Sequence, residues 1–277
     1  SLVTCEESRD RDSLELPGGQ AALLDAVADT AAKASTPLIL VLIHGRPITF
    51  GGVNGTRLLE RSSAALSCFR CGEQGGPALW DVLLGDANPS GHLTQAWPRA
   101  VGQVGGPYAA GALLRGKSHS YGFGEFPTYV DRPSTPLFPF GFGLSYSNHT
   151  LVGPLHVATA ASAGKPSSSV ARVSARVCAF GGPKGHAVVQ LYAQDPAGGK
   201  LVRPYRRLVG FERLPVPGAA QAATSQQAEK GAPASSKAGD ACAAISIEVD
   251  LMADLAYTDA DLTRRVHDGT YQLFLGM

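Results

Sequence analysis

Apolar residues recur at helical spacing in two segments of the first half of the chain. The first segment covers residues 20–34, where one stripe consists of Leu23, Leu24, Val27, Ala28 and Ala31. Pro37 follows this stripe, and proline cannot continue a helix. The second segment covers residues 78–84 and stops at Gly85, the residue type expected just past a helix C-terminus. The pattern therefore predicts two helices.

Short apolar runs of strand length lie between and after these helices. Residues 38–43 are apolar on both faces, as in a strand of a parallel sheet that helices cover. Residues 64–66 predict a second strand, and a third is expected around Leu93, after the turn residues 88–91. This alternation predicts an α/β fold. His44 follows the first strand at the edge where such sheets bind ligands, but a lone histidine there is more often structural than catalytic.

From Leu151 onward the pattern changes to the alternation of half-buried strands. At least five strands are predicted, over residues 170–177, 187–192, 208–211, 245–249 and 271–275. Strands at this spacing are typical of a β-sandwich. Two segments rich in small and polar residues interrupt them: residues 158–169, predicted to be a mobile loop, and residues 218–241, predicted to be a disordered insertion.

Composition and charge exclude several classes of partner. Apolar residues make up 44% of the 277 and charged residues 17%, as a folded protein needs for its core. The formal net charge of +1 gives no electrostatic reason to expect nucleic acid or an anionic membrane as a partner. No apolar run reaches the ~20 residues that a membrane helix takes. The first residues lack both an initiator Met and the pattern of a signal peptide, so the chain is expected to begin within a longer protein.

The cysteines give little support to metal or redox chemistry. There are five, an odd number, so they are not expected to make a disulfide framework, and at least one is free or paired elsewhere. Cys68 and Cys71 have the spacing of a redox pair or of half a zinc site. No second such pair follows, and His92 and His119 show no ligand spacing. We therefore expect no metal and no cofactor.

Two triplets have the form of N-glycosylation acceptors. They are Asn54-Gly55-Thr56 and Asn148-His149-Thr150. N-linked glycans are added to secreted proteins. The triplets therefore favour a secreted glycoprotein in an extracellular or vacuolar location.

Two runs rich in glycine and proline are the most specific motifs of the chain. Residues 72–98 read GEQGGPALWDVLLGDANPSGHLTQAWP, and residues 136–147 read PLFPFGFGLSYS. In this order they resemble the second domain of family 3 glycoside hydrolases, the β-glucosidase and β-xylosidase group. The later strands resemble the fibronectin type III-like domain that ends many of these enzymes, with matches that include Gly210, Phe211 and Glu212. The resemblance implies a partial α/β sandwich domain over residues 1–150, followed by an all-β immunoglobulin/fibronectin III-like sandwich over residues 151–277.

The resemblance implies a retaining, exo-acting β-glycosidase. In such enzymes one carboxylate attacks the anomeric carbon and a second, ~5 Å away, protonates the leaving oxygen. Relatives supply the nucleophile from a preceding (β/α)8 barrel, which does not fit in this chain. The chain then corresponds to the C-terminal region, with the missing N-terminal barrel as its partner and an oligosaccharide or glycoside as its substrate. Alone it is predicted to be inactive, and a non-catalytic carbohydrate-binding or interaction module is the alternative.

The segment before Gln20 carries the candidate catalytic residues. Relatives read E-x-E-(G/S)-x-DR-x-x-L-x-LPG-x-Q here, a form commoner among β-xylosidases and arabinofuranosidases than among β-glucosidases. Asp10 and Arg11 match the DR pair. In this register Glu7 is the candidate acid/base and Glu6 the second candidate. Cys5 occupies the position of the first Glu, so an acid/base at that position would be absent from this chain.

Overall fold

The computed structural model describes residues 11–51, 56–104, 131–133, 135–161, 169–196, 206–218 and 241–277. These residues form two compact units. The first unit contains the described residues up to Leu84, residues 94–104 and the described residues from 131 to Phe140. The second contains Gly85–Leu93 and the described residues from Gly141 onward. The predicted disordered insertion lies outside the described residues except for its two ends.

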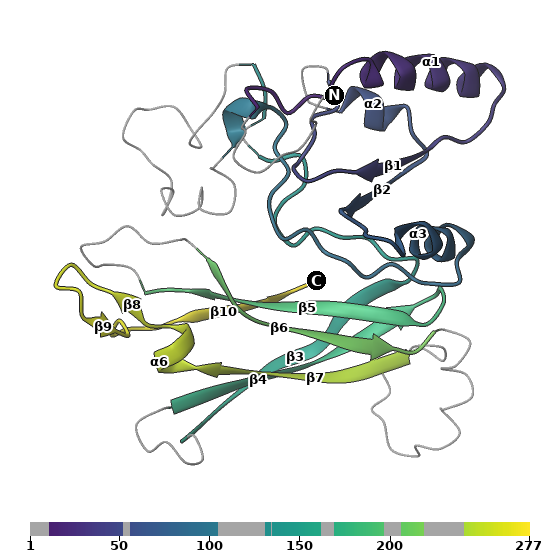
Figure 1. The fold of residues 1–277 in the computed structure, drawn as a ribbon. Helices are drawn as coiled ribbons and strands as arrows, with labels where there is room; N and C mark the ends of the chain where they lie inside the picture. The colour runs from purple at the N-terminus through teal and green to yellow at the C-terminus, as the bar shows by residue number, and fades with distance from the viewer. Residues whose placement is uncertain are drawn as a thin grey trace, which may run out of the picture. The chain divides into compact units, whose positions relative to one another are not determined.

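The first unit is a mixed helix and strand unit. Its elements in chain order are α1 (Gln20–Lys33), β1 (Ile39–Ile43), α2 (Arg57–Glu60), β2 (Ala64–Phe69), α3 (Gly75–Leu84) and the 3-10 helix η1 (Val101–Gln103). Strands β1 and β2 pair in parallel, with Ile39 opposite Ala64 (Figure 1). The two predicted helices, the first two predicted strands and the parallel pairing are confirmed. Helix α3 begins earlier than the pattern indicated, at Gly75.

Only one face of β1 is covered by the described residues. Leu40 and Leu42 are buried, whereas Ile39 and Ile43 on the opposite face are 48% and 72% exposed. Successive strand residues point to opposite faces, so this alternation separates a packed face from an open one. In the described part, one face of β1 is therefore packed and the other is open.

The second unit contains two three-stranded antiparallel sheets. Its elements are β3 (Asn148–Ala161), β4 (Ser169–Phe180), β5 (Gly185–Gln194), β6 (Arg207–Val216), β7 (Ala241–Asp250), α6 (Leu251–Asp254), β8 (Tyr257–Thr258), β9 (Arg264–Arg265) and β10 (Gln272–Gly276). The order is β10-β5-β6 in one sheet and β3-β4-β7 in the other, and the two sheets form two layers (Figure 1). All five predicted strand segments fall on strands of these sheets, although β10 begins one residue late.

The core of the second unit is filled from both sheets. Inward-facing residues of β4, β5 and β7 with no exposed surface include Val173, Val177, Val189, Leu191 and Val249. They belong to one hydrophobic cluster, as period-two alternation requires when two sheets face each other.

Two sequence expectations about strands were wrong. Residues around Leu93 form no strand; the backbone N–H and carbonyl of Leu93 instead bond to Phe142 and Gly141. The predicted loop 158–169 begins too early, because β3 continues to Ala161. Its alternation is obscured by Gly153, whose φ of +85° accompanies a register shift between Val152 and His156.

Candidate functional site

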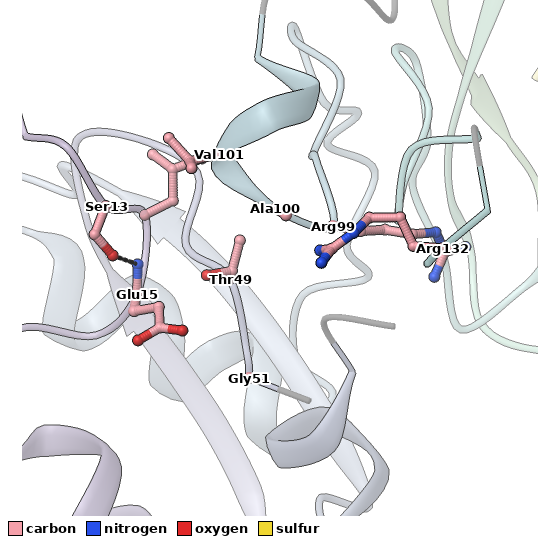
Figure 2. Close-up of a pocket in the computed structure, with 9 residues that line it drawn as sticks. Ser13, Glu15, Thr49, Gly51, Arg99, Ala100, Val101 and Arg132 are labelled. Carbon is pink, nitrogen blue, oxygen red and sulfur yellow. Dashed lines mark hydrogen bonds between the residues drawn. The ribbon is translucent and has the colours of Figure 1, made fainter. Parts of the chain in front are cut away.

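A polar pocket of about 210 Å³ lies in the first unit. Four separate segments line it, through Ser13 to Glu15, Thr49 and Gly51, Arg99 to Val101, and Arg132. In Figure 2 the Thr49 side chain lies between Glu15 on one side and Arg99 on the other. The pocket therefore combines a carboxylate, two hydroxyls and two guanidinium groups.

Backbone hydrogen bonds hold the segment that carries Ser13 and Glu15. The N–H of Thr49 donates to the Leu14 carbonyl at 2.8 Å, which ties the segment to the loop after β1. Arg11 Nη2 donates to the Glu15 carbonyl at 3.0 Å, and the Glu15 N–H donates to Ser13 Oγ at 3.1 Å (Figure 2). Arg11, the second residue of the DR pair, thus stabilises the backbone of this wall.

The opposite wall is held by amide and carbonyl groups. Gln103 is buried; its Oε1 accepts from the N–H of Arg99 at 2.7 Å and its Nε2 donates to the Pro133 carbonyl at 2.8 Å. Arg99 Nε donates to the Thr135 carbonyl at 2.9 Å. These bonds fix the direction of the Arg99 side chain.

Arg132 forms an ion pair with its neighbour. Its Nη2 donates to Asp131 Oδ2 at 2.8 Å, and this hydrogen bond lowers the pKa of the Asp131 carboxyl below its usual value. Asp131 pairs with Arg132, and the lining residues Glu15 and Arg99 carry opposite charges, so the formal charges of these four groups sum to zero. Donors and acceptors without net charge suit a neutral polyhydroxylated ligand.

His44 is a structural residue, as the sequence indicated. It is 8% exposed, and its Nδ1 lies 2.7 Å from the Arg46 carbonyl. Nδ1 therefore carries the proton, and Nε2 accepts from the Ser67 hydroxyl at 2.8 Å. Burial lowers the pKa of His44, and its ring contacts those of Phe69 and Trp97 at centroid distances of 4.6 and 5.1 Å. A neutral histidine with both nitrogens engaged links β1 to β2.

Trp97 packs beside His44. Its indole Nε1 donates to the Ile48 carbonyl at 2.6 Å, and the side chain is 2% exposed. Its backbone pairs with Phe138 in an isolated antiparallel bridge. The loop after β1 is therefore held between Trp97 and the segment that contains Leu14.

The sequence-predicted catalytic residues lie outside the described residues. These are Glu7 and Glu6, together with Cys5 and Asp10 of the same motif. The described chain begins at Arg11, one residue after the motif's aspartate. The pocket residues Thr49, Arg99 and Arg132 were not singled out by the sequence, because they belong to distant segments that share no motif. The one signal in the sequence was that Arg99 directly follows the first motif run, residues 72–98.

The first motif contributes a structural asparagine to the second unit. The Asn88 carboxamide oxygen accepts from Ser145 Oγ and from the N–H of Tyr146, at 2.8 and 2.9 Å. Its nitrogen donates to Ser147 Oγ at 3.0 Å and approaches the carbonyl oxygens of residues 183–184 at 3.5 and 3.4 Å. Asn88 thus joins the turn 88–91 to the start of β3 and to the turn between β4 and β5.

The second motif packs closely against side chains of β5. Gly141 has a φ of +80°, and a Cβ atom there would meet the side chains of Gln190 and Tyr192. His92 Nδ1 lies 2.6 Å from the Gly141 carbonyl, and the buried Gln190 donates to the same oxygen at 3.2 Å. The glycines of this motif are therefore required by close packing.

The cysteines of the described chain form two pairs. Cys68 pairs with Cys71, and Cys178 of β4 pairs with Cys242 of β7, directly opposite in the strand register. Within the described ranges, no group of three or more His, Cys, Asp or Glu side chains could hold a metal ion. The same ranges contain no helix that is long and apolar enough to cross a membrane.

Comparison with known proteins gives the family. Residues 2–146 match the model of the glycosyl hydrolase family 3 C-terminal domain. The chain is 34% identical over 214 residues to a periplasmic β-glucosidase of Salmonella typhimurium, covering 75% of this chain and 25% of the relative. It is 36% identical to a β-xylosidase of Formosa agariphila, covering 77% of this chain and 27% of the relative. The solved β-glucosidase of Erythrobacter marinus matches with a TM-score of 0.71 and 33% identity, over 98% of this chain and 30% of that one.

The fold and the matched motifs define a region of a glycoside hydrolase. The chain belongs to the glycosyl hydrolase family 3 C-terminal domain family. It spans about a quarter of the length of the curated relatives it matches.

Proposed function

We propose that this chain is the C-terminal region of a retaining, exo-acting β-glycosidase that removes sugars from the ends of plant-type oligosaccharides or polysaccharides. The family membership supports a glycosidase. The observation that carries the proposal is the bond from the Thr49 N–H to the carbonyl of Leu14, seven residues after Glu7, which ties this segment to the loop after β1. A polar pocket adjoins this anchored segment. An acid/base must be held in a fixed geometry beside the bond it protonates, and we propose that the anchor at Leu14 contributes to this.

Glu7 is the proposed acid/base, and Glu6 is the second candidate. Either would protonate the glycosidic oxygen and then deprotonate the attacking water, while a carboxylate of the missing barrel forms the glycosyl-enzyme intermediate. The relatives include enzymes named β-glucosidase and β-xylosidase, and one named exo-α-(1→6)-L-arabinopyranosidase. β-Xylosidase or α-arabinofuranosidase activity is favoured by the form of the motif around Asp10 and Arg11.

We also propose a division into a partial α/β sandwich domain at 1–150 and a fibronectin type III-like sandwich at 151–277. The two antiparallel sheets with one shared core support the second domain. The open face of β1, with Ile43 exposed, supports packing of this face against a further part of the enzyme. Two cysteine pairs support an oxidising, extracellular or vacuolar location.

A chimera tests the catalytic proposal. The corresponding region of the Erythrobacter marinus β-glucosidase is replaced by this chain, so that the host supplies the nucleophile. We expect hydrolysis of 4-nitrophenyl glycosides by the chimera. Glu7→Gln should lower kcat for this substrate by ~10²–10⁴-fold, the usual contribution of general acid–base catalysis.

Leaving-group dependence identifies the role of the changed residue. An acid/base variant retains more activity on a dinitrophenyl glycoside, whose leaving group needs no proton, and added azide restores turnover with a β-glycosyl azide as product. Glu6→Gln is the matched control in the same loop. An active chimera in which neither substitution changes kcat would refute the assignment. A folded but inactive chimera that still binds oligosaccharide would favour the non-catalytic module.

A further inference from the structure

Exposed and buried residues alternate along the segment that leads into β3 and along the start of this strand. Tyr146 is 47% exposed, and Asn148 and Thr150 are also exposed. Between them Ser147 is buried and His149 is half-buried. Side chains two residues apart in an extended chain point to the same side. Asn148 and Thr150, both in β3, therefore lie on the solvent side, and the exposed Tyr146 precedes them in the bend before the strand.

The chain has three asparagines, and each is followed two residues later by Ser or Thr. Asn54 lies outside the described residues. Asn88 is excluded as an acceptor because Pro89 occupies the middle position, and its carboxamide is hydrogen-bonded within the second unit. In contrast, no described residue is hydrogen-bonded to the carboxamide of Asn148.

We propose that Asn148 carries an N-linked oligosaccharide whose first sugar packs against the ring of Tyr146. The inference rests on the proposed passage of the protein through a secretory pathway. In the attachment step, Asn148 Nδ2 attacks the anomeric carbon of a lipid-linked oligosaccharide pyrophosphate. The C–N bond forms as the bond from that carbon to the phosphate oxygen breaks. The amide nitrogen loses one proton, and the lipid pyrophosphate leaves with the bonding electron pair.

The surroundings of Asn148 suit a bulky substituent. Asn148 is the first residue of β3, which is an edge strand of its sheet. In the strand register Asn148 lies opposite Phe180 of β4, and Phe180 is 41% exposed. The apolar face of an N-acetylglucosamine ring can cover the exposed part of Tyr146 without entering the core. An oligosaccharide at this position also obstructs addition of another strand at the start of β3.

The full chain, secreted from a eukaryotic host behind a cleavable signal peptide, tests the proposal. Intact mass is measured before and after peptide-N-glycosidase, and peptide mapping in ¹⁸O water identifies the asparagine that becomes aspartate. We expect conversion at Asn148. Asn148→Gln and Thr150→Ala should each remove one glycan mass, whereas Asn54→Gln leaves the glycan at Asn148 in place. Secreted wild-type chain with unmodified Asn148 would overturn the proposal.

The Tyr146 contact is tested separately. Removal of the glycan from the folded wild-type chain should lower Tm by ~2 °C, a shift that is measurable for a protein of this size. In Tyr146→Ala the glycan mass is unchanged, and enzymatic removal no longer changes Tm. An equal Tm shift in both proteins would refute the packing. Neither result depends on hydrolytic activity, so failure here is distinguishable from failure of the catalytic proposal.

Discussion

The carboxamide nitrogen of Asn88 lies 3.0 Å from the hydroxyl oxygen of Ser147, although 59 positions separate them in the chain. This contact belongs to the set of bonds that joins the first motif to the start of β3. Asn88 of that motif therefore has a structural role within the second unit.

Substitution of Asn88 should destabilise the second unit. Asn88→Ala leaves backbone and hydroxyl groups without their partner, and each such group costs ~1–3 kcal/mol when it is shielded from water. We expect the free energy of unfolding to fall by ~2–3 kcal/mol, measured by urea denaturation of unglycosylated protein. Asn148→Ala is the matched control, because that asparagine is exposed, and it should change the free energy by less than ~0.5 kcal/mol. Equal losses in the two variants would contradict the role given to Asn88.

Two glycines with the same backbone conformation allow the energetic cost of backbone strain to be measured separately from the cost of side-chain crowding. Gly141 and Gly181 have φ values of +80° and +78°, but a Cβ atom meets other side chains only at Gly141. Gly181→Ala should cost only the ~1–2 kcal/mol of the left-handed conformation. Gly141→Ala should cost at least ~1 kcal/mol more, because Gln190 and Tyr192 must move. Indistinguishable denaturation midpoints would show that β5 accommodates the methyl group freely.

Mild acid should weaken the fold through two histidines. Burial is the largest cause that lowers the pKa of both His44 and His149 below the ordinary value of 6.5. Below that pH the unfolded chain binds protons that the folded chain still excludes, so the free energy of unfolding falls as the pH drops. Urea denaturation between pH 7.5 and 5 measures this slope. His44→Asn and His149→Asn should each flatten it, and an unchanged slope in both variants would contradict the prediction.

The disulfide between β4 and β7 should contribute strongly to the stability of the second unit. It joins cysteines 64 positions apart, and loops of this size are stabilised by ~4 kcal/mol in the chain-entropy model. Replacement of Cys178 and Cys242 by Ala should lower the free energy of unfolding by ~2–4 kcal/mol. The same double change at Cys68 and Cys71, only three positions apart, should have a smaller effect. The opposite ranking of the two pairs would refute this prediction.

The isolated chain should release no nitrophenol from aryl xylosides or glucosides. Formation of the glycosyl-enzyme intermediate needs a nucleophilic carboxylate that relatives provide from the barrel. A continuous absorbance assay with purified chain measures turnover. Hydrolysis that Glu7→Gln abolishes would show that this chain carries both carboxylates.

The parts of the fold that could be predicted are those in which local pattern and tertiary packing agree. The helix at residues 20–33 and the strand at residues 39–43 have strong periodicity, and both appear within one residue of the expected start. Strand β3 was partly missed because its bulge at Gly153 breaks the alternation. The Cys178–Cys242 pair depends on the register of β4 against β7, which the spacing of cysteines does not reveal.

The candidate site was harder to predict than the fold. Thr49, Arg99 and Arg132 meet at one pocket only after four segments have folded together. Arg11 could be identified from its motif, but its bond to the Glu15 carbonyl could not. A motif specifies residue types along the chain, whereas a pocket depends on which loops come together.

Trp97 also makes the first unit visible to fluorescence. The chain has two tryptophans, and both belong to this unit: Trp97 is 2% exposed and Trp80 is 61% exposed. Acrylamide should therefore quench Trp80 and spare Trp97 until the unit unfolds. Emission excited at 295 nm will then report on the first unit alone, and comparison with far-ultraviolet circular dichroism, which follows both units, will reveal whether they unfold together.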